Sequence, residues 1–194
     1  DEHGNQASMQ LPSPQCPALT CTSDCNVKIQ HGFVINEPFS RFLPVYSSMP
    51  LTKPDPAVRR ALIVVHGLES NALEYFHDLA KVIRGFGPAY ERTTLLIGPM
   101  FANFHAVFRA TKGRLDQWDK DDSQGVGDMK PLFWSKNSWI SGMPAGSKHT
   151  SVSSFEALDR LVEFLIERWP ATAGGIRVIG FSAGCQFAAR WAFF

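Results

Sequence analysis

The feature that most constrains the fold of this 194-residue chain is the run Ala61–Val65, which is apolar throughout and ends in three β-branched residues. An uninterrupted run of this kind predicts a strand buried on both faces, because a strand with one wet face alternates apolar and polar residues. Strands buried on both faces are typical of parallel sheets covered by helices. Thr93–Ile97 and Ile176–Ile179 predict two further buried strands.

Three segments with helical spacing follow in the pattern that such a sheet requires. Ala72–Phe86 is expected to begin after a cap at Ser70 or Asn71, and Phe155–Trp169 after a cap at Ser153 or Ser154. The third helix is expected over Ala183–Phe194. The apolar stripes of the first two helices consist of Leu73, Phe76, Leu79, Ala80 and Ile83, and of Leu158, Leu161, Val162 and Leu165. This alternation of strands and helices predicts an α/β fold with a mainly parallel sheet and flanking helices.

The domain organisation follows from where this pattern is interrupted. Residues 1–26 are polar and rich in proline, so they are expected to form an arm outside the domain of residues 27–194. Val27–Val34 and Arg41–Ser47 alternate, and we expect a hairpin at a sheet edge. Residues 100–152 show little periodicity and are too long for an ordinary connection, which favours an insertion, a binding loop or a lid.

Composition excludes several partner classes. The formal net charge is +1 with no basic block, so nucleic acid is not expected as a partner. The chain contains no apolar run of the roughly 18 residues that a transmembrane helix needs, and 44% of its residues are hydrophobic, a proportion typical of globular domains. Nothing in the sequence requires a cofactor.

Cysteine spacing indicates an oxidising compartment. Cys16, Cys21 and Cys25 lie close together in the arm, and Cys185 is distant. We expect a disulfide in a secreted protein, with the pairing left open, rather than a metal site of thiolates and His31, whose spacing fits no zinc pattern. The chain begins at Asp1, which fits either a leader peptide already removed or a start chosen for expression.

The strongest chemical motif is Gly180-Phe181-Ser182-Ala183-Gly184, which matches G-x-S-x-G. It follows a predicted strand and opens a predicted helix, and this context favours a nucleophilic serine on a sharp turn over an incidental serine in a glycine-rich turn. The glycines would remove Cβ atoms that collide at the turn. Ser182 is therefore the candidate nucleophile.

A second motif, His66-Gly67-Leu68, follows the first predicted strand. The Leu68 and Ala183 backbone N–H groups would together form an oxyanion hole. We expect His66 to hold this loop rather than to act as a base.

These two motifs resemble the α/β-hydrolase superfamily over about residues 58–194. The stretches Trp139–Gly142, Ser153–Asp159 and Gln186-Phe187 are more loosely similar to secreted fungal-type hydrolases. The resemblance implies an α/β-hydrolase fold, Ser182 as nucleophile, and Leu68 and Ala183 as oxyanion donors. It also implies a small-molecule ester-like substrate.

The sequence departs from this family after its nucleophile. The family order is serine, then acid, then histidine, but no Asp, Glu or His follows Gly184, and Cys185 stands where another glycine is common. The C-terminal strands that bear acid and base are therefore expected to be missing. His105 and His149, with the aspartates 116, 119, 121, 122 and 128, are the upstream substitutes, although those aspartates fail the calcium-loop template.

Three functional interpretations remain open at this point. The first is a carboxylic ester hydrolase that uses Ser182, with weak or no turnover from this chain alone. The others are an inactive binding protein on the same fold and a truncated fragment. Aromatic residues in the long segment would either line a substrate pocket or pack into a core of their own: Phe101, Phe104, Phe108, Trp118, Phe133, Trp134 and Trp139.

Overall fold

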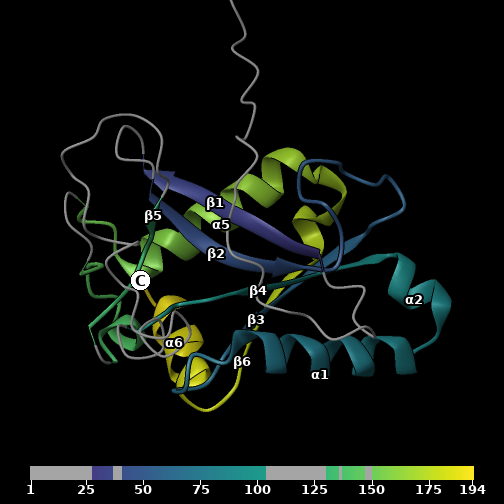
Figure 1. Ribbon diagram of the computed structural model, residues 1–194. Coiled ribbons are helices and arrows are strands. Elements are labelled where there is room, and N and C mark those ends of the chain that lie inside the picture. Colours follow the sequence, from purple (N-terminus) through teal and green to yellow (C-terminus); the bar gives the residue numbers. More distant parts are fainter. Residues whose placement is uncertain (1–27, 37–40, 104–129, 136, 147–149) are drawn as a thin grey trace, which may run out of the picture.

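The computed structural model describes residues 28–36, 41–103, 130–135, 137–146 and 150–194, and shows an α/β fold (Figure 1). One sheet carries the strands in the order β1-β2-β4-β3-β6, and the short β5 pairs with β2 outside this path. The strands are β1 (Lys28–Asn36), β2 (Arg41–Ser47), β3 (Arg60–Val65), β4 (Thr94–Pro99), β5 (Lys130–Pro131) and β6 (Ile176–Gly180). The helices are α1 (Ala72–Gly85), α2 (Pro88–Arg92), α5 (Ser154–Arg168) and α6 (Ala183–Trp191), with short 3₁₀ turns η1 (Ser138–Ser141) and η2 (Pro170–Gly175).

The sheet is mixed, with a parallel centre and an antiparallel edge. β3 pairs in parallel with β4 on one side and with β6 on the other, as the three apolar runs predict. β1 and β2 form the expected antiparallel hairpin, and β2 pairs antiparallel with β4. Two of the three parallel strands, β3 and β6, therefore precede the candidate functional motifs.

Helices cover both faces of the sheet because its central strands are apolar on both faces. In β3, Ala61, Ile63 and Val65 belong to one buried cluster and Val64 to another. The first cluster is covered by α5 and α6, and the second by α1. Figure 1 shows α1 and α5 on opposite sides of the sheet. The resulting three layers place the carboxyl ends of β3 and β6 side by side.

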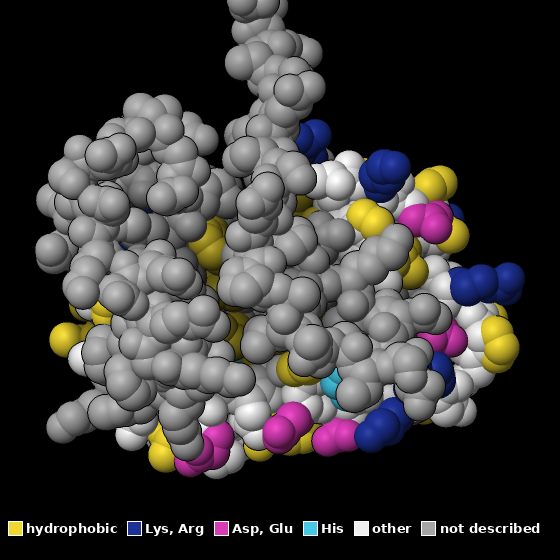
Figure 2. Space-filling model, viewed as in Figure 1, with side chains coloured by type: hydrophobic (Ala, Val, Ile, Leu, Met, Phe, Trp, Pro, Cys, Tyr) yellow, Lys and Arg dark blue, Asp and Glu magenta, His cyan; other side chains and the backbone are white. Residues whose placement is uncertain are grey.

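The two long helices follow their predicted stripes. Phe76 and Ile83 of α1 are buried, and its charged side chains lie along the outer edge of the molecule in Figure 2. The α5 helix begins as expected, with the Ser153 side chain accepting a hydrogen bond from the Glu156 N–H. The expected cap of α1 differs, because the Asn71 side chain donates to the Glu74 carboxylate instead of accepting from the helix.

Two sequence predictions at the C-terminal end are wrong in part. Ile176–Ile179 was predicted to be buried on both faces, but no residue of β6 is fully buried and Arg177 is exposed. Among the described residues β3 is the one strand that flanks β6, so one edge of β6 lacks a described partner. The final helix ends at Trp191 rather than Phe194, and Phe193 and Phe194 are exposed.

Candidate functional site

The candidate site is built around a strained turn at Ser182. Ser182 has φ 51° and ψ −114°, and it is the N-cap residue between β6 and α6. A positive φ is unfavourable for a residue with a Cβ, and such backbone strain concentrates at functional sites. The residue is exposed. The turn therefore presents the serine to solvent at the start of a helix.

The two motif glycines make this turn sterically feasible. A Cβ added to Gly180 would lie 2.2 Å from the Gly184 carbonyl oxygen, and a Cβ added to Gly184 would lie 2.3 Å from the Val65 carbonyl oxygen. Both obstacles are backbone atoms, so neither can turn away as a side chain would. Gly180 thus lets α6 pack against its own strand, and Gly184 lets α6 pack against the end of β3.

The topology places this turn at a switch point of the sheet. β3 and β6 are adjacent and parallel, with Val65 opposite Gly180. The chain leaves β3 toward α1 on one face and leaves β6 toward α6 on the other. Open α/β sheets bind ligands outside the carboxyl ends of strands whose connections diverge in this way. Strand order is not readable from the sequence, so the switch point is an observation separate from the G-x-S-x-G motif.

The predicted oxyanion donors belong to these two diverging connections. Leu68 lies in the loop after β3, and Ala183 is the first residue of α6. The Phe181 N–H donates to the Val65 carbonyl oxygen over 3.1 Å, which joins the two loops at their start. Within the described residues, neither the Leu68 nor the Ala183 N–H donates a backbone hydrogen bond.

His66 is fully buried and holds the loop after β3 in place. Its Nε2 accepts a hydrogen bond from the Phe101 N–H at 2.9 Å, and its Nδ1 lies 2.7 Å from the Gly67 carbonyl oxygen. These partners require a neutral ring with the proton on Nδ1. Desolvation by burial lowers the pKa of His66 to about 4, against the opposing hydrogen bond to Gly67. The predicted structural role of His66 is confirmed.

Ser70 provides a second attachment for the same loop. The sequence indicates only that this serine could cap α1. It is buried and has φ 55°. Its hydroxyl donates to the Phe101 carbonyl oxygen and accepts from the Asn103 N–H, each over 3.4 Å. The loop carrying Leu68 is thus fixed at both ends to the segment after β4. No sequence signal marks the left-handed conformation of Ser70.

Part of the aromatic content of the long segment forms core rather than a pocket. Phe101, Trp134 and Trp139 are fully buried in the larger cluster, and Phe133 is half-buried. The Trp139 ring lies 4.9 Å from the His66 ring and 5.6 Å from the Phe187 ring of α6. For these three buried residues, packing is the correct interpretation. Phe104, Phe108 and Trp118 lie outside the described residues.

The two described histidine side chains make contacts of their own. His66 uses both ring nitrogens in the loop, and His77 lies on α1, where its ring contacts Phe76. His105, His149 and the aspartates 116, 119, 121, 122 and 128 lie outside the described residues, as does His31 except for its backbone in β1.

The described residues show no disulfide, no cluster of metal ligands and no helix that could span a membrane. Cys185 is exposed and forms no disulfide within the described residues, while Cys16, Cys21 and Cys25 lie outside them. No group of three or more potential metal ligands occurs among the described side chains. None of the described helices combines the length and apolarity that a membrane crossing needs.

Comparisons with known proteins add little to this geometry. No protein-family model matches the chain, and no curated protein does. A solved structure that resembles it is poly(aspartic acid) hydrolase-1 from Sphingomonas sp. KT-1, with 15% sequence identity and a TM-score of 0.47. The comparison covers 82% of this chain and 49% of the other, so the chain spans about half the length of that protein.

Proposed function

We propose that this chain belongs to a serine hydrolase of the α/β-hydrolase type that acts on small carboxylic esters. The observation that carries the proposal is the exposed, strained Ser182 at the switch point between β3 and β6. A strained strand-to-helix turn is the arrangement expected of a nucleophile elbow at a G-x-S-x-G motif, and it supports the proposal.

The proposed chemistry is acyl transfer. The Ser182 Oγ attacks the ester carbonyl carbon, its proton passes to a base, and the carbonyl oxygen becomes an oxyanion. The Leu68 and Ala183 N–H groups stabilise that oxyanion, and the positive end of the α6 dipole supports them. Collapse of the tetrahedral intermediate expels the alcohol, and water then releases the acid from the acyl-enzyme.

The proposal is tested by covalent labelling of the serine. A fluorophosphonate probe is expected to form an adduct on the peptide that contains Ser182, detected by mass spectrometry. Ser182→Ala is expected to abolish the adduct, and Ser151→Ala, which removes another exposed serine, is expected to preserve it. An adduct that persists in Ser182→Ala would refute the assignment of the nucleophile.

The identity of the base is a separate question with its own experiment. Turnover of p-nitrophenyl esters by residues 1–194 that disappears in Ser182→Ala would show that these residues include the base. His105→Asn and His149→Asn would then identify which upstream histidine accepts the proton.

A catalytically inactive binding protein is the second candidate function. The observation that favours it is the commitment of both His66 nitrogens to the loop, so this histidine cannot serve Ser182 as a base. Reversible binding of an ester or carboxylate without any labelling of Ser182 would support this alternative.

We also propose that the protein is secreted. The support is the spacing of Cys16, Cys21 and Cys25, because grouped cysteines in a short arm are typical of oxidising compartments. Alkylation of the purified protein before and after reduction counts the thiols that disulfides protect. Four reactive thiols without reduction would contradict the proposed disulfide.

A further inference from the structure

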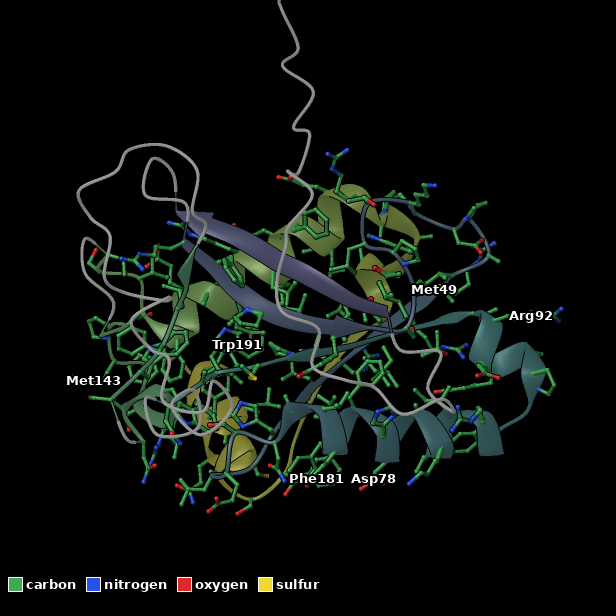
Figure 3. The ribbon with its side chains drawn as sticks, viewed as in Figure 1. Met49, Asp78, Arg92, Met143, Phe181 and Trp191 are labelled. Carbon is green, nitrogen blue, oxygen red and sulfur yellow. The ribbon has the colours of Figure 1, made fainter. Side chains whose placement is uncertain are left out.

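Tyr75 lies between the two loops of the proposed site, the loop after β3 and the turn after β6. It is a half-buried residue of α1. Its ring stacks on the exposed ring of Phe181, with the ring centres 5.0 Å apart and an angle of 24° between the planes. Figure 3 shows Phe181 beside the N-terminal part of α1. The tyrosine therefore contacts the residue that immediately precedes Ser182.

Tyr75 also lies against Gly67, the residue that immediately precedes Leu68. A Cβ added to Gly67 would lie 2.9 Å from the Tyr75 hydroxyl oxygen, and 3.5 Å from each of two ring carbons. A separation of 3.5 Å is ordinary van der Waals contact, so the hydroxyl oxygen alone occupies the space of a Gly67 side chain. Phe181 stacks on one face of the ring, so a shift of the Tyr75 hydroxyl would disturb the stacked pair.

The backbone on either side of this contact is already fixed. His66 and Ser70 bind the segment after β4, while the Gly67–Leu68 peptide between them shows no backbone hydrogen bond from its N–H among the described residues. The carbonyl oxygen of this peptide, on Gly67, lies 2.7 Å from the His66 Nδ1 and accepts a hydrogen bond from the Ser70 N–H over 3.4 Å. These hydrogen bonds hold the peptide through its oxygen, and the contact with Tyr75 adds packing beside Gly67. An oxyanion donor must be aimed to within a few tenths of an ångström, so a packing contact at this peptide has a direct effect on its function.

We propose that Tyr75 is a positioning residue, whose stacked ring and hydroxyl hold the Gly67–Leu68 peptide in its place relative to the nucleophile turn. This inference rests on the proposed function, because it assigns Tyr75 a role through the Leu68 N–H. Tyr75 itself does not contact the reacting atoms. It joins the loop after β3 to the turn after β6 across the switch point.

The test is a rescue experiment with two substitutions. Gly67→Ala is expected to slow fluorophosphonate labelling of Ser182 at least about tenfold, since loss of an oxyanion donor costs about 100-fold or more. Tyr75→Phe is expected to slow it about threefold, because the peptide loses one contact but keeps its donor. The double variant should label within about threefold of the unmodified chain, because removal of the hydroxyl leaves room for the methyl group.

The matched control removes a different tyrosine hydroxyl. Tyr90 lies on α2, where its ring is tilted against that of Phe86, and it is not among the atoms nearest to Gly67. Gly67→Ala combined with Tyr90→Phe is expected to label as slowly as Gly67→Ala alone. The proposal is overturned if the Tyr75→Phe double variant labels no faster than Gly67→Ala, or if Tyr90→Phe rescues equally well.

A spectroscopic readout separates this inference from the proposed function. The ¹H–¹⁵N resonance of the Leu68 amide is expected to shift in Gly67→Ala and to return most of the way in the double variant. If the unmodified chain is not labelled, the proposed function fails, and the Leu68 resonance still decides the positioning role. A Leu68 resonance that does not move in Gly67→Ala, or does not return, overturns it.

If Gly67→Ala does not fold, Tyr75→Phe alone tests the positioning role of Tyr75. The expected result is a shifted Leu68 amide resonance at an unchanged melting temperature, because a hydroxyl at a half-buried position contributes little to global stability. An unchanged Leu68 resonance together with unchanged labelling would overturn the proposal.

Discussion

At the scale of single residues, Gly180 and Gly184 are positions where the turn tolerates no side chain. We expect Gly180→Ala or Gly184→Ala to lower the free energy of unfolding by about 3 kcal/mol or more, because the new methyl group meets backbone atoms within 2.5 Å. Gly85→Ala is the control, since a Cβ there meets nothing within 4 Å. It should be neutral or stabilise α1 by up to about 1 kcal/mol. Denaturant unfolding measures all three, and equal losses would contradict the steric argument.

His66 makes stability depend on pH through a buried neutral ring. Burial lowers its pKa from 6.5 to about 4, so the unfolded chain binds a proton at a higher pH than the folded chain does. The stability that the neutral ring contributes is present above about pH 6.5 and is lost as the pH falls toward 4. At about 1.4 kcal/mol per pKa unit, the loss is about 3 kcal/mol.

The measurement is the free energy of unfolding across pH 4 to 7. We expect the rise in the free energy of unfolding with pH to become shallower in His66→Gln. It should stay the same in His77→Gln, where the replaced ring is only half-buried. A slope that is unchanged in His66→Gln would show that other groups cause the acid sensitivity.

At the scale of elements, α6 is held by Phe187. This side chain is fully buried, and its ring lies 4.7 Å from Phe101 and 5.3 Å from Phe155. Phe187→Ala is expected to lower the free energy of unfolding by about 3–5 kcal/mol, as truncation of a buried phenylalanine does. Phe193→Ala, at a position that is 90% exposed, is expected to change it by less than about 0.5 kcal/mol. Thermal melts of both variants distinguish the two positions.

The elements that the sequence predicted well are those whose pattern is local. The apolar run of β3, the stripe of α1 and the serine cap of α5 each depend on neighbouring residues, and the structure confirms their positions. β6 was predicted less well, because its burial depends on which strands flank it. The short elements between residues 130 and 141 show no period, since the long-range packing of Trp134 and Trp139 determines them.

At the scale of the whole molecule, the order of strands determines where stability is greatest. β3 is flanked by strands on both sides and is covered on both faces, whereas β6 has one described neighbour. Native-state hydrogen exchange is expected to be slowest for amides of β3 and β4 and faster for β6. Equal protection of β6 and β3 would indicate that the second edge of β6 is covered in solution.

The candidate site shows the same division between local and global information. Ser182, Ala183 and Leu68 are predicted from two short motifs, because each motif describes a turn that a few adjacent residues form. The switch point depends on the strand order, and the contact between Tyr75 and Gly67 joins a helix to a loop eight positions earlier. Side-chain packing of this kind leaves no signature that one sequence can reveal.

The strain at Ser182 has a consequence for how this chain tolerates change over generations. A left-handed backbone at a serine costs on the order of 1–3 kcal/mol, and glycine would remove most of that cost. Selection for stability alone would therefore replace Ser182 with glycine. In related chains that no longer need the hydroxyl, glycine is expected to replace serine at this position. The residue found there would therefore indicate whether the nucleophile has been under selection.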